Sequence, residues 1–453
     1  MQLTSALPEG GSSMAKNDVV KFSPHIPNNI PEVKLLVAPE GNWHPDSDGT
    51  WPLHPFAYDR WEKEELSWYD TSYIHAGLNP FLEYKVKGVE LLDLMECISV
   101  NTFRKFPVGK ARHTIICGED GKIIIDGIII RRSEDEFICA CLPDPAMFNE
   151  QMGNRFNIQS EYAGEKHFFY QFCGPKSLQI IEEACRKDLH DLKFMYTADA
   201  EICGKKVWIL RTGMAGTLGY EVHGEIEDAH EVYEKLLEVG EKYGLQKLGR
   251  YAYINAHCEG SIPQIAEHFA TPMDPVVLSG SLPRDSELKF RSPIDLGWDN
   301  LVRFDHEFVG KAALEKELAG PHRTGVHLIW NKEDILKVMA GTMDPEKRYD
   351  TMDMVCDYDY IRNNAGMHID AVYAGDEMIG ASSGRMLSPK TRDMISIASI
   401  STDYAKEGQE VEVLWGNPGT NQVRVRATVT LFPYIKEGRN ENFDTETIPH
   451  PVF

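Results

Sequence analysis

The sequence lacks several features that would place it in a large class of proteins. None of its apolar runs reaches the eighteen residues expected of a membrane-spanning helix. The opening MQLTSALPEGGSS lacks the basic start and apolar core of a secretory signal peptide. Positive charge is scarce, with 47 Lys and Arg against 70 Asp and Glu and a formal net charge of -23. These shortages argue against a membrane protein and against nucleic acids or anionic lipids as partners.

Cysteine is present without an organising pattern. The nine cysteines are scattered, mostly in apolar runs such as FICACL, where a buried small hydrophobic residue is the plainer interpretation. No pair of C-x-x-C units predicts a zinc site, and no spacing predicts a disulfide framework. Motifs for nucleotide phosphates, for a hydrolase nucleophile elbow and for corrinoid methyl carriers are also missing. We therefore expect no metal and a reducing, cytoplasmic location.

The length of 453 residues, 42% of them apolar, is enough for two or three domains. From Phe81 to Gly244 hairpins alternate with helices without regular β-α-β units, which predicts an α+β domain. After Thr324 short strands recur at regular spacing, punctuated by Gly and Pro, which predicts a small closed antiparallel barrel. The expected divisions are a flexible leader (1–20), a catalytic domain with an N-terminal arm (21–320), a barrel domain (325–435) and a surface tail (436–453).

The segment RTGMAGTLGYEVHG, from Arg211 to Gly224, places a loop with three glycines between two predicted strands. Glycine lets a flat ligand approach the backbone, although on spacing alone a plain hairpin turn is the favoured explanation. Glu221 is unusual there, because a carboxylate in an apolar strand is costly unless it is paired. A pterin ring would pair it, since the ring N–H and the exocyclic amine form an edge with two donors.

The segment LGRYAYINAHCEG contains four further candidates. Tyr251 and Tyr253 alternate along an expected strand, so that both would point to one face. Most buried tyrosines only pack in a core, but a tyrosine can also protonate a leaving phenolate. His257 and Glu259 are spaced for an acid/base or metal pair, and without a third ligand the metal is the weaker interpretation. Farther along, Trp298 has two possible roles. It forms one wall of a site for a flat ligand, or it packs in the hydrophobic core.

Three segments, taken in order, resemble the glycine-cleavage T-protein (aminomethyltransferase) superfamily. RTGMAGTLGYEVHG is similar to its TG-x-x-G-x-x-G-[FY]-E motif, and DLGWDNLVRFDHEFVGKAAL to its G-[WY]…FIG-[RK]-x-AL segment. MIGASSGRMLSP resembles the IG-x-x-TSG-x-x-SP of its C-terminal barrel. The similarity runs from about Phe81 to Pro433. QFCGPKS, LKFMYTADAEICG and GRYAY look closest to the tetrahydrofolate-dependent vanillate/3-O-methylgallate O-demethylases.

This resemblance implies tetrahydrofolate as cofactor and a small aromatic ether as substrate. It implies that Glu221 holds the pterin edge and that Tyr253 is the acid/base group. The expected cofactor contacts are Gln171, Phe194, Met214, Tyr220, Glu221 and Trp298. The expected substrate contacts are Trp51, Tyr73, His75, Leu142, Tyr251 and His257.

Departures from the family pattern narrow the expected substrate. Leu142 stands where the demethylases place an arginine for the substrate carboxylate, and a lost charge-assisted hydrogen bond removes about 1.5–3 kcal/mol. A carboxylate-free arene is therefore expected. The aminomethyltransferases carry an acidic pair where this chain has Ile125 and Asp126, which counts against glycine cleavage. A pterin-site Trp that follows ESG in the demethylases has no counterpart after CEG.

These features together predict a tetrahydrofolate-dependent O-demethylase that acts on an aromatic methyl ether. Cleavage of a methylenedioxy arene to methylene-tetrahydrofolate is the first alternative, and a non-catalytic folate-binding protein is the second. A homo-oligomer is compatible with the sequence.

Overall fold

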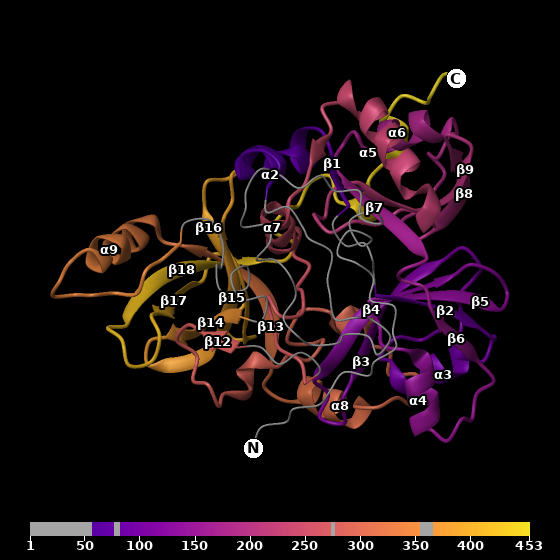
Figure 1. The fold of residues 1–453 in the computed structure, drawn as a ribbon. Coiled ribbons are helices and arrows are strands. Elements are labelled where there is room, and N and C mark those ends of the chain that lie inside the picture. Colours follow the sequence, from indigo (N-terminus) through magenta and orange to yellow (C-terminus); the bar gives the residue numbers. More distant parts are fainter. Residues whose placement is uncertain (1–56, 77–81, 273–276, 354–365) are drawn as a thin grey trace, which may run out of the picture.

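The computed structural model describes residues 57–76, 82–272, 277–353 and 366–453. Within these ranges three sheets are arranged around a central helix, α7 (Arg250–Gly260), as Figure 1 shows. A six-stranded sheet with its helices lies at the upper right, a five-stranded sheet at the lower right, and a barrel at the left. The α+β fold predicted from the alternation of hairpins and helices is confirmed.

The five-stranded sheet is antiparallel throughout, with the order β3-β4-β5-β2-β6. Buried and half-buried residues alternate along much of β4, because one face packs into a core that helices α3 and α4 complete. The elements are β2 (Glu83–Lys87), α3 (Leu91–Ile98), β3 (Ala111–Cys117), β4 (Ile123–Arg131), β5 (Glu136–Ala140), α4 (Pro145–Gln151) and β6 (Gln159–Tyr162). The hairpin predicted over GKIIIDGIIIRRSEDEFICACL is therefore confirmed.

The six-stranded sheet has the order β11-β1-β7-β10-β9-β8 and holds the glycine-rich loop. Helices α5 and α6 supply apolar side chains to the core on one of its faces. The elements are β1 (Tyr73–His75), β7 (His167–Cys173), α5 (Ser177–Cys185), β8 (Thr197–Ile202), β9 (Lys205–Leu210), β10 (Gly219–Glu225), α6 (Ala229–Glu241) and β11 (Gln246–Lys247). The other face is free of these helices and carries the candidate site.

The predicted C-terminal barrel is present and closed. Six strands pair in the order β14-β15-β16-β13-β18-β17, and β17 pairs back onto β14. An additional short strand from outside the predicted barrel, β12 (Val277–Ser279), lies parallel to β14. The barrel strands are β13 (Arg323–Trp330), β14 (Gly366–Ala374), β15 (Glu377–Leu387), β16 (Met394–Ser401), β17 (Glu410–Trp415) and β18 (Val423–Leu431), and helices α8 (Lys311–Ala319) and α9 (Lys332–Thr342) precede and follow β13.

The strand predicted for Tyr251 and Tyr253 is wrong, because these residues lie in helix α7. Every residue from 251 to 260 is buried. The helix therefore has no exposed face, and its sequence lacks the amphipathic period by which a helix is recognised. Ala252 and Ala256, four residues apart, bring it close to helix α2 (Trp61–Asp70) and strand β1. On a helix the two tyrosines point in nearly opposite directions.

The C-terminal segment follows the surface of the six-stranded region and is anchored to it. Arg211, directly after β9, donates to the carbonyl oxygens of Asn440 and Phe443, both at 2.9 Å. Short 3-10 helices occur within this segment and elsewhere in the chain: η2 (Ile226–Asp228), η3 (Glu287–Lys289), η4 (Asp299–Leu301), η5 (Asn440–Asn442) and η6 (Thr445–Thr447). The segment predicted as a surface tail thus fixes the base of the glycine-rich loop.

A second anchor of this segment groups potential metal ligands. Asp188 Oδ2 lies 2.7 Å from His450 Nδ1, and Asp188 Oδ1 lies 3.1 Å from His190 Nδ1. The two imidazole rings stack with their centroids 3.9 Å apart. Ring-nitrogen lone pairs lie in the ring plane, so two stacked rings do not converge on one ion. The arrangement is a pair of ion pairs that holds the C-terminal segment in place.

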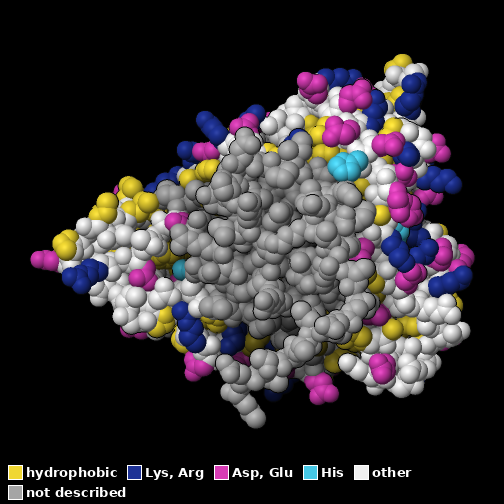
Figure 2. All heavy atoms as spheres, viewed as in Figure 1, with side chains coloured by type: hydrophobic (Ala, Val, Ile, Leu, Met, Phe, Trp, Pro, Cys, Tyr) yellow, Lys and Arg dark blue, Asp and Glu magenta, His cyan; other side chains and the backbone are white. Residues whose placement is uncertain are grey.

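No helix in the described ranges is long and apolar enough to cross a membrane. On the face shown in Figure 2, Lys and Arg side chains alternate with Asp and Glu along the visible rim. On the coloured part of this face the acidic side chains are therefore mixed with basic ones.

Candidate active site

A row of polar side chains crosses the face of the six-stranded sheet that lies opposite α5 and α6, where helix α7 packs. His75 of β1 pairs with Gln171 of β7, which pairs with Glu221 of β10. Directly paired residues of neighbouring strands share a face, so the three side chains lie in register. Two of these residues were predicted as cofactor contacts and one as a substrate contact, and the strand register explains why they meet.

Glu221 is 6% exposed and has protein partners on both oxygens. Gln171 Nε2 donates to its Oε1 at 3.2 Å, and His223 Nε2 lies 3.0 Å from its Oε2. Tyr73 donates its hydroxyl to Gln171 Oε1 at 2.9 Å, which fixes the orientation of the amide. A carboxylate has about four acceptor positions, so each oxygen retains one for a ligand. The site therefore fits a ligand edge with two N–H donors, such as that of a pterin.

The glycine-rich loop between β9 and β10 is closely packed against its surroundings. A Cβ atom on Gly213 would lie 2.5 Å from Cys173 Sγ, and one on Gly219 would lie 2.7 Å from the Phe172 carbonyl oxygen. A Cβ on Gly260, the last residue of α7, would lie 2.5 Å from the Met214 carbonyl oxygen. The glycines are thus required for close backbone approach, and they join the loop to the end of α7.

Tyr253 projects from α7 between two imidazole rings. It stacks on His75 with centroids 4.2 Å apart and an interplanar angle of 11°, and it meets His257 edge-on at 5.2 Å. It shares a buried cluster with Tyr73, the residue that orients Gln171. The predicted acid/base tyrosine therefore contacts His75, at the end of the polar row opposite Glu221.

His257 is buried in a neutral form. Its Nδ1 lies 3.2 Å from the Ile262 carbonyl oxygen and must carry the proton, while Nε2 has no hydrogen-bond partner within the described part of the chain. Burial lowers the pKa of His257 to about 4, and the hydrogen bond to Ile262 and the charge of Asp126 only partly offset this effect. His257 and Glu259 do not form a pair. Glu259 accepts instead from Trp68 Nε1 at 3.0 Å and Tyr69 Oη at 2.7 Å.

Several predicted contacts are not brought into the polar row. Tyr220 points to the opposite face of β10 and is buried in the core with α5 and α6. Leu142 is 2% exposed in the core of the five-stranded sheet. Tyr251 packs against the barrel and meets Trp61 edge-on at 6.2 Å. Trp298 meets His113 edge-on at 5.0 Å in a separate core.

The remaining predicted contacts have more limited support. Tyr73 is fully buried, so it supports Gln171 rather than lining an open pocket. Phe194 and Met214 are half-buried, in the turn before β8 and in the glycine-rich loop. Trp51, like most of the predicted N-terminal arm, lies outside the described residues.

The structure adds two interactions that sequence reasoning missed. His223 contacts Glu221, and Asp126 lies 2.7 Å from His113 Nε2. The alternation of β10 was a usable signal for the first, since residues 221 and 223 of a strand share a face. The second joins β3 to β4 diagonally and depends on a strand register that the sequence does not reveal.

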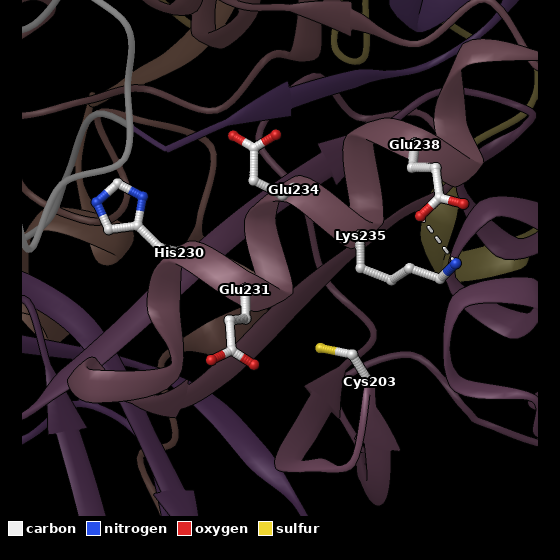
Figure 3. Close-up of a pocket in the computed structure, with 6 residues that line it drawn as sticks. All are labelled: Cys203, His230, Glu231, Glu234, Lys235 and Glu238. Atoms are coloured by element: carbon white, nitrogen blue, oxygen red, sulfur yellow. Dashed lines mark hydrogen bonds and ion pairs between the residues drawn. The ribbon is translucent and has the colours of Figure 1, made fainter.

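A surface hollow elsewhere in the molecule is unrelated to this site. Figure 3 shows it between helix α6 and the turn after β8, with Lys235 paired to Glu238 at 2.9 Å. None of the candidate cofactor or substrate residues lines this hollow. Its lining residues are Cys203, His230, Glu231, Glu234, Lys235 and Glu238.

Comparisons with known proteins identify the family of this chain. The family model described as the GCVT N-terminal domain matches residues 50–279. A sesamin methylene transferase of Sinomonas sp. is 34% identical over 425 residues, covering 88% of this chain and 94% of that protein. A syringate O-demethylase of Sphingobium sp. is 28% identical over 435 residues, covering 87% and 93%.

A solved structure shows the same fold as this chain. The crystal structure of the glycine cleavage system aminomethyltransferase T from Bartonella henselae matches with a TM-score of 0.62 and 18% identity, over 85% of this chain and 92% of that one. The family match spans about half of the chain, and the first relative is similar over nearly all of it. The chain therefore belongs to the GCVT (aminomethyltransferase) family, and it is a tetrahydrofolate-dependent one-carbon transferase.

Proposed function

We propose that this enzyme transfers a methyl group from a carboxylate-free aromatic methyl ether to N5 of tetrahydrofolate. The observation that carries the proposal is the place of Tyr253, a buried tyrosine stacked on His75. In this proposal Tyr253 is the proton donor, and it contacts His75, the member of the polar row farthest from Glu221. The similarity to a syringate O-demethylase over 87% of the chain supports the same reaction class.

In this proposal Glu221 and Gln171 hold the pterin. Glu221 accepts the two N–H groups of the pterin edge, and the hydrogen bond from Tyr73 keeps the amide of Gln171 turned toward Glu221. Tetrahydrofolate supplies the nucleophilic nitrogen that accepts the one-carbon unit. The protein's contribution to this half of the reaction is orientation, which in enzymes supplies a large share of the rate enhancement.

Tyr253 acts on the other half of the reaction as general acid. An aryl ether is a poor electrophile, because the phenolate that leaves is basic. When the carbon–oxygen bond breaks with its electron pair on oxygen, the Tyr253 hydroxyl donates its proton to that oxygen. The leaving phenol and a tyrosine side chain are acids of the same chemical type, so a tyrosine is suited to protonating this leaving group. His257 lies edge-on to Tyr253, and because burial lowers its pKa to about 4 it adds no positive charge there at neutral pH.

The surroundings of the site favour an uncharged substrate. Leu142, at the position where the resembling demethylases have a carboxylate-binding arginine, lies in the apolar core of the five-stranded sheet outside the polar row and supplies no charge. Two carboxylates add negative charge here: Asp126 acts on His257, and Glu221 acts on Tyr73 after the larger effects of burial, Cys173 and Tyr253. An anionic substrate would be repelled by both of these carboxylates.

A methylenedioxy arene is the second candidate donor. The specific observation in its favour is the 34% identity to a sesamin methylene transferase, which is higher than the identity to the syringate O-demethylase. In both reactions Glu221 would hold the pterin edge and Tyr253 would protonate the leaving oxygen. They differ in product, which is methyl-tetrahydrofolate in one case and methylene-tetrahydrofolate in the other.

One experiment tests the reaction and distinguishes the donors. The purified enzyme is incubated with tetrahydrofolate and a panel of methoxy- and methylenedioxy-arenes, with and without a carboxylate, and the folate products are identified by mass spectrometry. Methyl-tetrahydrofolate from uncharged methoxyarenes is expected. Methylene-tetrahydrofolate from methylenedioxy-arenes would establish the second candidate, and folate binding without turnover of any ether would overturn both.

The role of Tyr253 is tested by removing its hydroxyl. Tyr253→Phe is expected to reduce turnover by at least about a hundredfold, the usual contribution of general acid catalysis, with folate affinity unchanged. Tyr233→Phe is the matched control, since Tyr233 is equally buried in the core behind the sheet. A Tyr253→Phe enzyme with full activity would remove this residue from the mechanism.

A further inference from the structure

His223 is held more firmly than an ordinary strand residue. It lies two positions after Glu221 on β10 and is 2% exposed. Its ring stacks on Trp208 of β9 with centroids 3.7 Å apart and an angle of 11°. On the other neighbouring strand, Phe169 of β7 lies 5.5 Å away at 22°. Both aromatic residues are its directly paired cross-strand neighbours, so the strand register itself fixes the ring.

The hydrogen bonding of this ring defines its tautomer. Nε2 lies 3.0 Å from Glu221 Oε2, and a carboxylate oxygen can only accept. Nδ1 is buried without a partner among the residues that the structure describes. The neutral ring with its proton on Nε2 satisfies both facts, because that proton is donated to Glu221 and the bare Nδ1 needs no acceptor.

Glu221 is thus held from both sides by neutral donors. Gln171 donates to one oxygen and His223 to the other, which fixes the plane of the carboxylate. Neutral donors stabilise the ionised carboxylate without the full opposite charge that an arginine or lysine would place there.

We propose that His223 is a positioning residue that orients Glu221 for the pterin edge of tetrahydrofolate. This inference rests on the proposed role of Glu221 as the pterin-binding carboxylate. His223 itself does not contact the ligand, because its ring faces are covered by Trp208 and Phe169. Its effect on folate binding is transmitted only through the hydrogen bond to Glu221.

Two substitutions separate this role from simple packing. His223→Phe keeps an aromatic ring between Trp208 and Phe169 but removes the donor. His223→Gln loses the ring but can place an amide nitrogen where Nε2 lies. The probe is 5-formyltetrahydrofolate, a stable folate, and its affinity is measured by quenching of tryptophan fluorescence, with thermal denaturation as a check of folding.

A positioning role predicts that His223→Phe weakens folate binding at least tenfold with little change in melting temperature, since hydrogen bonds to charged groups are worth more than neutral ones. His223→Gln is expected to recover most of the affinity despite its poorer packing. A packing role predicts the reverse order. If His223→Phe binds folate like the wild type, or if His223→Gln is the weaker binder, the inference is overturned.

Two additional variants keep the test decisive. If His223→Phe does not fold, His223→Asn replaces it, because the shorter amide cannot reach Glu221 and should bind more weakly than His223→Gln. Glu221→Gln tests the underlying assignment separately. If Glu221→Gln binds folate normally, the pterin assignment of Glu221 fails, and with it the basis for His223. If Glu221→Gln loses binding and His223→Phe does not, only the positioning role fails.

Discussion

Protonation of His257 should make the stability of this protein depend on pH in a defined direction. The pKa of this imidazole is lowered by burial from 6.5 to about 4, and the ring has no partner for a second proton within the described chain. Between these pH values the unfolded chain binds more protons than the folded one, so stability falls as the pH drops. The stabilisation is fully present above pH 6.5, falls progressively between pH 6.5 and pH 4, and is fully lost below pH 4.

The size of this effect follows from the two pKa values. One pKa unit corresponds to about 1.36 kcal/mol, so the full contribution is about 3 kcal/mol, of which about 2 kcal/mol is lost by pH 5. His257→Asn keeps a donor for the Ile262 carbonyl oxygen but cannot be protonated. Its stability should therefore be lower than that of the wild type at pH 7.5, and the gap should narrow by about 2 kcal/mol at pH 5.

The measurement is urea denaturation of both proteins at several pH values from 7.5 to 5. His230→Gln is the control, because His230 is exposed on helix α6 and its loss should leave the pH dependence unchanged. The buried His327, whose pKa is also lowered by burial, is the same in all three proteins and cancels. The pKa of the buried His268 is lowered by burial and also by the charge of His257, so its contribution cancels only between the wild type and His230→Gln. Parallel curves for wild type and His257→Asn would refute the reasoning.

Two other substitutions test how the glycine-rich loop is built. Gly213→Ala places a Cβ 2.5 Å from Cys173 Sγ and should destabilise the protein by about 1–3 kcal/mol in thermal denaturation, as overpacking does. Adding Cys173→Ala should restore part of this loss, and no recovery would contradict the steric explanation. Arg211→Met removes the donors to Asn440 and Phe443 and should make the C-terminal segment cleavable by limited proteolysis, whereas unchanged resistance would show that other contacts hold it.

Local patterns were sufficient to predict most of the fold. The helix over EDAHEVYEKLLEVGEKYG and strand β17 have one more exposed and one buried side, so their residue periods are visible in the sequence. Strands β15 and β16 are buried along nearly their whole length, and their short apolar runs bounded by Gly and Pro indicated them instead. Helix α7 lacks such a period because it is buried on every side, and the alternating tyrosines imitated a strand. The strand β12 and its parallel pairing with β14 were also hidden, since three residues carry no period of their own.

The candidate site shows the same division between local and long-range information. Glu221 was predictable because a carboxylate between apolar neighbours needs a partner, and Tyr253 because of a family resemblance. The alignment of His75, Gln171 and Glu221 depends on the register of three strands distant in sequence, which no local pattern specifies. Tyr220 was misplaced for a simpler reason, since the residue beside Glu221 on a strand must face the other way.

The complete burial of helix α7 has a practical consequence for altering the substrate range of this enzyme. One side of the helix, with Tyr251 and Cys258, packs on Met386 and Ile395 of the barrel, while Tyr253 projects from another side. A volume change at those barrel positions would move the helix, and the hydroxyl of Tyr253 with it. On the proposed role of Tyr253 as the acid, libraries aimed at new substrates should therefore include these barrel positions, because they adjust the place of its hydroxyl through helix α7.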